Sequence, residues 1–190
     1  MEDGSKTLGR YAIAGCAAAM AIPNLAAFGH SMETGMKFID WFYPWPQNHK
    51  PYLARAALIR THIICSGAAL LGGAAVVALD QPPSPAARRA YATLATTGAA
   101  ASALFSVQSH DQVVAGSFVC MALGTCVPAA LGRLRESYAA LFGAGVVFRA
   151  MVLVVPLLPA SWSRRKAKLG IIWLSWSAPL AAVTWACRGG

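Results

Sequence analysis

Six stretches of the chain are apolar and nearly uncharged over the length that a membrane-spanning helix requires. Such a helix needs about 20 apolar residues to cross roughly 30 Å of hydrocarbon. The six stretches are residues 11–30, 53–79, 90–107, 113–131, 138–158 and 169–187. Because they take up almost the whole chain, the sequence predicts an all-α, polytopic membrane helical bundle. We expect about six transmembrane helices in a single integral membrane domain over residues 1–190.

The composition favours the same class of protein. Hydrophobic residues make up 57% of the chain and charged residues 12%, whereas an ordinary soluble domain has about 25% charged residues. The net charge of +9 comes from cations near the ends of the apolar stretches, where they meet lipid phosphates. We therefore expect membrane lipids as partners and no nucleic acid. The five cysteines lie in or beside apolar stretches without metal-binding spacing, so no metal site is expected.

One connection is longer than the others, and it is rich in aromatic residues. It covers residues 31–51 and contains the sequence Trp-Phe-Tyr-Pro-Trp-Pro at 41–46. Tryptophan and tyrosine at the end of a span favour the lipid headgroup level. The remaining loops are short, which predicts antiparallel packing of consecutive helices. We call side B the membrane side that carries residues 31–51 and the turn at 109–112, and side A the opposite side.

The sequence does not settle orientation, the kind of membrane or the oligomeric state. Alternating crossings put seven lysines and arginines on side A and seven on side B, so the positive-inside rule favours neither orientation. An even number of crossings predicts that both termini lie on side A.

Arg149 is the most unusual charge, because it lies about midway along the fifth stretch. Insertion scales give a central arginine a cost of roughly 2.5 to 3.5 kcal/mol, so it should face protein or a wet interior and bind a substrate there. The alternative is a structural arginine that extends toward the interface or bonds a free carbonyl of a helix broken by proline.

Side B gathers most of the remaining ionisable groups, and we expect them to line a polar cavity near that membrane face. The candidate catalytic residues are Glu33, Asp40, His110 and Asp111, and the candidate binding residues include His30, Arg60 and His62. A histidine beside a carboxylate in a half-buried, low-dielectric site has a pKa suited to proton transfer. The alternative is that these charges belong to solvated turns and that His62 is a packed histidine.

Aromatic residues beside these acids indicate the chemistry of a substrate. Trp41, Tyr43 and Trp45 could wall a pocket in which an acid protonates an olefin, and their ring faces would shield a carbocation. Membrane enzymes that cyclise or isomerise isoprenoids and sterols use this logic. The inference is an analogy of mechanism and not a resemblance to a family.

The cofactor is left open by the sequence. Haem with two histidine ligands needs histidines on facing helices at similar depth, and His62 with His30 or His110 meets that condition. The spacing is unspecific, so we do not expect haem, and zinc is less expected still because the cysteines are placed elsewhere.

Three functions compete at this point. The first is binding of a small hydrophobic, isoprenoid- or lipid-like molecule near side B, with acid–base transformation by a cyclase or isomerase mechanism. The second is a non-catalytic accessory subunit of a larger membrane complex, which the short loops and recurring small residues favour. The third is a small transporter, suggested by Arg149 and by the prolines Pro23 and Pro128 in the first and fourth stretches.

Overall fold

A computed structural model describes residues 2–42, 49–79, 82–109 and 112–154, and side chains within 8–40, 49–79, 82–109 and 115–146 apart from residue 117. Every regular element in these ranges is a helix. The elements are α1 (Glu2–His30), α2 (Met32–Phe42), α3 (Lys50–Ala54), α4 (Ala56–Leu79), α5 (Pro85–Ser109), α6 (Gln112–Ala130) and α7 (Leu134–Val154). The prediction of an all-α helical membrane bundle is confirmed.

Three of these helices are long and apolar enough to cross a membrane. They are the part of α1 from Leu8 to His30, α4 (Ala56–Leu79) and α5 (Pro85–Ser109), and α6 holds a shorter apolar stretch, Phe118–Ala130. Helix α7 coincides with the first part of the fifth predicted stretch. The sixth stretch, 169–187, lies outside the described residues. The count of six spans therefore stays a prediction.

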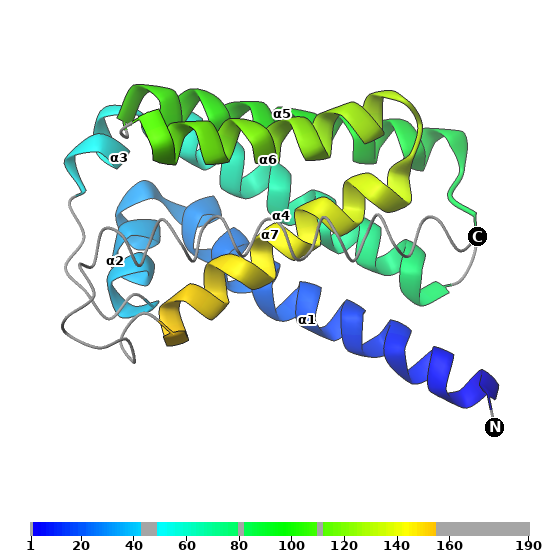
Figure 1. Ribbon diagram of the computed structural model, residues 1–190. Helices are drawn as coiled ribbons and strands as arrows, with labels where there is room; N and C mark the ends of the chain where they lie inside the picture. The colour runs from blue at the N-terminus through cyan, green and yellow to red at the C-terminus, as the bar shows by residue number, and fades with distance from the viewer. Residues whose placement is uncertain (1, 43–48, 80–81, 110–111, 155–190) are drawn as a thin grey trace.

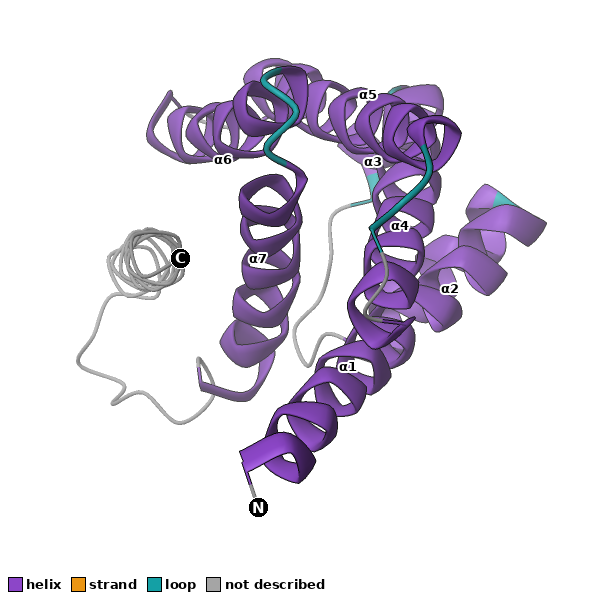
Figure 2. Cartoon of the chain, turned by 90° about the vertical axis from the view of Figure 1, so that its right-hand side faces the viewer, coloured by secondary structure: helices purple, strands orange, loops and turns teal. Residues whose placement is uncertain are grey.

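The helices pack in chain order. Helix α1 contacts α4, α4 contacts α5, α5 contacts α6 and α6 contacts α7. In Figure 1 these helices run back and forth along the bundle, and Figure 2 shows α5 and α6 at the top with α7 and α1 below them. The expected antiparallel packing of consecutive long helices is confirmed.

Glycine and serine bring the long helices close together. A Cβ added at Gly98 of α5 would lie 2.8 Å from the Ser66 backbone nitrogen of α4, and one at Gly67 of α4 would lie 2.9 Å from Leu25 Cγ of α1. The Tyr138 ring of α7 packs directly over Gly73 of α4. Small residues at contacts of this kind let helix backbones approach in a membrane, where no hydrophobic effect drives association.

Local sequence signals fix the ends of α5 and α6. The Ser84 hydroxyl accepts a hydrogen bond from the Ala87 N–H at 3.2 Å, which is an N-cap followed by proline at the first helical position. At the end of α6, Gly132 has a φ of 74°, and the Arg133 N–H donates to the Pro128 carbonyl at 2.8 Å. This is the Schellman arrangement, which glycine adopts without steric cost.

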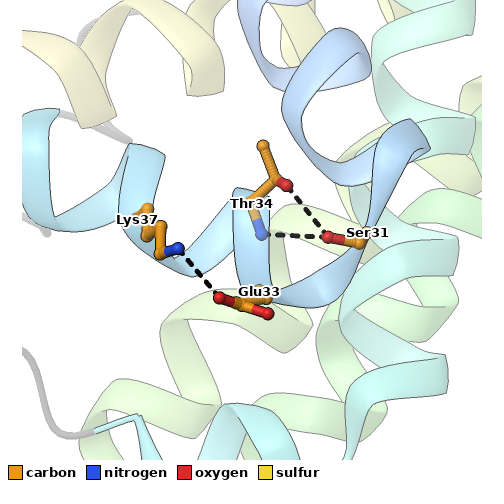
Figure 3. A network of polar contacts seen from close by, with 4 residues as sticks. All are labelled: Ser31, Glu33, Thr34 and Lys37. Atoms are coloured by element: carbon orange, nitrogen blue, oxygen red, sulfur yellow. Dashed lines mark hydrogen bonds and ion pairs between the residues drawn. The ribbon is translucent and has the colours of Figure 1, made fainter.

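The predicted loop 31–51 contains a helix that the sequence analysis missed. Helix α2 begins at Met32 and ends at Phe42. The Ser31 hydroxyl caps it by accepting from the Thr34 N–H at 3.1 Å, and a second bond of 2.9 Å joins the two hydroxyls (Figure 3). The cap satisfies N–H groups that the first helical turn would leave free. The chain thus turns at Ser31 and places α2 beside the end of α1 (Figure 1).

Candidate functional site

Five helices meet at the side-B end of the bundle around an apolar cluster. Its buried members are Ala27, Phe28, Met36, Ile59 and Phe105, and the partly buried Met32, Phe38, Ile39, Tyr52, Leu58 and Ile63 pack against them. We call these residues the side-B cluster. The rings of Tyr52 and Phe105 lie 5.2 Å apart, and burial raises the pKa of Tyr52, so its phenol is uncharged at neutral pH. The ends of α1 and α5 and the start of α4 are therefore brought together around apolar side chains, and the polar cavity expected on side B stays a prediction.

Helix α2 covers this cluster with its apolar face and turns its charges outward. Met32, Met36 and Ile39 belong to the side-B cluster, and they recur at the three- to four-residue spacing of one helix face. Glu33 lies on the opposite face, where its carboxylate pairs with Lys37 Nζ at 2.8 Å (Figure 3). The hydrogen bond and the charge of Lys37 lower the pKa of Glu33. Glu33 is thus an exposed, ionised residue that does not join the cluster.

Asp40 and His49 form the one carboxylate–histidine pair among the described side chains. His49 Nε2 and Asp40 Oδ1 are 2.8 Å apart. The histidine side chain is 27% exposed and the aspartate side chain 50%. Asp40 follows Ile39 of the side-B cluster, and His49 precedes the α3 helix that carries Tyr52. The pair therefore lies at the rim of the apolar cluster, half in contact with solvent.

Arg60 has structural partners. Its Nε donates to the Phe28 carbonyl at 3.2 Å and its Nη2 to the Gly29 carbonyl at 3.4 Å. Helix α1 ends at His30, so these carbonyls lie in its last turn and lack helical partners. The guanidinium fastens the end of α1 to α4, and the predicted part of Arg60 in substrate binding stays a prediction.

His62 and His30 occupy different environments. His62 Nδ1 lies 3.0 Å from the Gly98 carbonyl and 3.3 Å from Ser66 Oγ, at the contact of α4 with α5. Because a carbonyl only accepts, Nδ1 carries the proton and donates. His30 is exposed at the end of α1. Within the described residues no group of three or more histidine, cysteine, aspartate or glutamate side chains could hold a metal ion.

Two serines that the sequence analysis did not select end α5 beside the cluster. The hydroxyl oxygens of Ser106 and Ser109 are buried and have no hydrogen-bond partner, and Ser106 is only 1% exposed. Between them, Gln108 Oε1 accepts from Arg55 Nε at 2.9 Å, which joins the end of α5 to the start of α4. Serines three residues apart at the end of an apolar helix were the available signal.

Several predicted site residues lie outside the described part of the chain. His110, Asp111, Tyr43 and Trp45 lie wholly outside the described residues. Trp41 lies within α2 and Arg149 within α7, but their side chains are not among those described. The roles expected of these six residues stay predictions.

Comparisons with known proteins add no assignment to this geometry. No protein-family model, curated protein or solved structure matches the chain. Any function for the side-B end must therefore be argued from the residues themselves.

Proposed function

We propose that this protein binds a small hydrophobic, isoprenoid-like molecule at the side-B cluster and transforms it by acid–base chemistry. The observation that carries the proposal is the 2.8 Å contact between His49 and Asp40 at the rim of that cluster. We take the protein to be a multi-pass membrane protein with six spans, so that such a molecule reaches the cluster from the bilayer.

The Asp40–His49 pair has the arrangement of an acid–base group. A carboxylate that accepts from Nε2–H fixes the tautomer of the ring and leaves the lone pair on Nδ1. In its protonated form the ring can give the Nδ1 proton to an olefin carbon of the substrate, and the freed nitrogen can then take a proton from a carbon next to the cation. In an isomerisation one C–H bond breaks and one forms, so the pair ends the cycle in its starting protonation state.

The side-B cluster suits an apolar and flexible ligand. Met32 and Met36 have unbranched side chains that fit irregular shapes, and they come from α2, which is joined to the bundle through the turn at Ser31. Phe28, Tyr52 and Phe105 supply rings whose negative faces favour a developing positive charge. These properties support an isoprenoid-like chain over a compact polar substrate.

Two variants of α2, one test and one control, examine this function. Purified protein in lipid vesicles would be incubated with farnesol or geranylgeraniol, and products would be separated by gas chromatography and mass spectrometry. Asp40→Asn removes the carboxylate that accepts from His49 and orients its ring, and it should lower turnover about 100-fold or more while ligand binding persists. The control, Glu33→Gln on the outer face of the same helix, should keep wild-type turnover.

Equal turnover in the two variants would exclude the Asp40–His49 pair as the acid–base group. Absence of both binding and turnover in the wild type would remove the proposed function itself.

One observation favours the accessory-subunit function as the second candidate. Helix α1 exposes a series of small residues, Ala12, Gly15, Cys16 and Ala19, and a Cβ added at Gly15 would meet no atom within 4 Å. Small residues on an outer helix face allow close packing against a helix of another subunit. Native mass spectrometry after mild detergent extraction distinguishes the two, because a fixed set of partner proteins favours the subunit and a monomer with bound lipid favours the enzyme.

A further inference from the structure

We propose that the Ser106 and Ser109 hydroxyls bind the uncharged oxygen at the polar end of the ligand. The inference rests on the proposed function, since it names the chemical class of the molecule that would occupy the side-B cluster. That class is an isoprenoid-like alcohol, aldehyde or ketone, as opposed to a hydrocarbon or a phosphate ester.

The two serine hydroxyls are unsatisfied in the described structure. Neither oxygen has a partner although both are buried, and Ser106 is 1% exposed. A helical serine ordinarily returns its hydroxyl to the carbonyl four residues earlier. Ser106 and Ser109 forgo that bond, and a buried polar group without a partner costs free energy. A ligand that supplies the partner recovers it.

The spacing of the two serines suits a single ligand atom. Residues three apart on a helix lie on one face with Cβ atoms about 5–6 Å apart. One oxygen atom placed about 2.8 Å from each hydroxyl oxygen bridges such a gap. A carbonyl oxygen can accept from both serines, and a ligand hydroxyl can donate to one and accept from the other. A single oxygen therefore satisfies both orphaned groups.

The serines follow the side-B cluster closely along α5. Phe105, the residue before Ser106, is a buried member of the cluster, and its ring lies 5.2 Å from the Tyr52 ring. Adjacent residues of a helix lie at the same depth but point about 100° apart, so a ligand with its apolar body in the cluster would extend its end group around α5 to reach the serines. The same molecule would have its carbon chain among Phe28, Met36 and Ile59.

The charges near the serines favour an uncharged end group, although the exposed Lys50 of α3 is also a cation of this end. The two described arginines of this end are already engaged, Arg55 with Gln108 and Arg60 with the last carbonyls of α1. A phosphate or carboxylate buried here would need a cation of its own. Neutral hydroxyl donors suit a neutral oxygen.

A matched series of ligands and variants tests the subsite. The probes are farnesol, farnesal, farnesene and farnesyl diphosphate, which share one carbon chain and differ in the end group. Affinity would be measured for the full chain in lipid nanodiscs by native mass spectrometry. We expect farnesol and farnesal to bind about threefold to tenfold more tightly than farnesene for each hydrogen bond gained, and farnesyl diphosphate to bind more weakly than farnesol.

The serine variants locate that preference. Ser106→Ala and Ser109→Ala should each lower the affinity for farnesol about threefold to tenfold and leave that for farnesene unchanged. The control is Thr97→Ala, which removes an exposed hydroxyl from the same helix and should change neither affinity. Without ligand, both alanine variants should unfold at the wild-type temperature or above it, since they remove an unpartnered group.

Each alternative outcome has a distinct meaning. If farnesol and farnesene bind equally, or if the serine variants retain the preference for farnesol, the subsite is wrong while the proposed hydrophobic binding stands. A drop in the unfolding temperature of ligand-free Ser106→Ala would show that a water or a structural bond satisfies the serine, and that also overturns the subsite. If no member of the series binds, the subsite and the proposed function fail together.

Discussion

At the side-A end of the bundle, buried hydroxyls form a chain of hydrogen bonds between helices. At the side-B end, two serine hydroxyls have no hydrogen-bond partner. At side A, the Tyr91 hydroxyl of α5 lies 3.3 Å from Ser137 Oγ of α7, and Ser137 Oγ donates to the Thr125 carbonyl of α6 at 2.9 Å. Since Ser137 donates to the carbonyl, it accepts from Tyr91. At side B, Ser106 and Ser109 have no partner.

The side-A hydroxyls have a role in packing the helices, whereas we propose a role in ligand binding for those at side B. The side-A chain of bonds ties three helices together and uses serine as both donor and acceptor, which is how polar residues join helices in a membrane. One side-A hydroxyl, that of Tyr138, is also unpartnered, but its ring fills the space over Gly73 and meets the Tyr91 ring edge-on at 6.5 Å. The side-B serines have no large side chain to account for their place, which is why we propose a ligand as their partner.

The largest loss of stability should come from a change at the contact between α4 and α5, two helices that run from side A to side B. Gly98→Ala would bring a methyl group to 2.8 Å from the Ser66 backbone nitrogen, and a backbone atom cannot move aside cheaply. We expect a loss of about 3 kcal/mol in the free energy of unfolding, measured by denaturant titration in detergent. Gly72→Ala is the control, because its added methyl group would meet no atom within 4 Å. Equal stability of the two variants would contradict the tight α4–α5 contact.

A pair of serine-to-alanine changes tests the contrast between the ends directly. Ser137→Ala leaves the Tyr91 hydroxyl and the Thr125 carbonyl without their shared partner, and it should lower the free energy of unfolding by about 2 kcal/mol. Ser106→Ala removes a hydroxyl that bonds to nothing and should cost nothing. Both serines are at least 99% buried, so burial does not separate them. Equal losses in the same denaturant titration would mean that the two ends do not differ in this way.

Hydropathy and length predicted the long helices well because each residue of a membrane span contributes to the same signal. The predicted stretches 11–30 and 113–131 match helices that end at His30 and Ala130. Helix starts were predicted less well. Helix α5 begins at Pro85, five residues before the apolar stretch, because Ser84 and Pro85 start a helix in a polar segment.

The candidate site was harder to predict, since its partners come from distant parts of the chain. Asp40 could be selected as a candidate acid, but its contact with His49 depends on the turn into α2, an 11-residue helix that is too short for a search for spans. The bond of Arg60 to an α1 carbonyl could not be predicted, because it is a tertiary contact between residues far apart in the sequence. The unpartnered state of Ser106 likewise follows only from the packing around it.

The smallest effect concerns the ion pairs of the two ends. At side A, Arg133 Nη2 lies 2.7 Å from Glu136 Oε1 at the turn between α6 and α7, and the glutamate side chain is 21% exposed. A hydrogen bond from its own backbone N–H, together with Arg133, lowers the pKa of Glu136 below 4.5. A lowered folded-state pKa stabilises the protein above the ordinary value and loses that effect as the pH falls through the folded value.

Glu136→Gln should therefore lower the free energy of unfolding by about 0.5 kcal/mol at pH 7. The difference from wild type should disappear as the pH falls through the lowered folded-state pKa of Glu136, where the carboxyl group becomes protonated. Glu33→Gln at side B should have no measurable effect at either pH, because the Glu33–Lys37 pair lies on the outer face of α2 and is exposed on both sides. The measurement is a denaturant titration of wild type, Glu136→Gln and Glu33→Gln, at pH 7 and at an acidic pH at which Glu136 is protonated. A loss that persists in acid, or an equal loss in Glu33→Gln, would show that the ion pair does not hold the side-A turn.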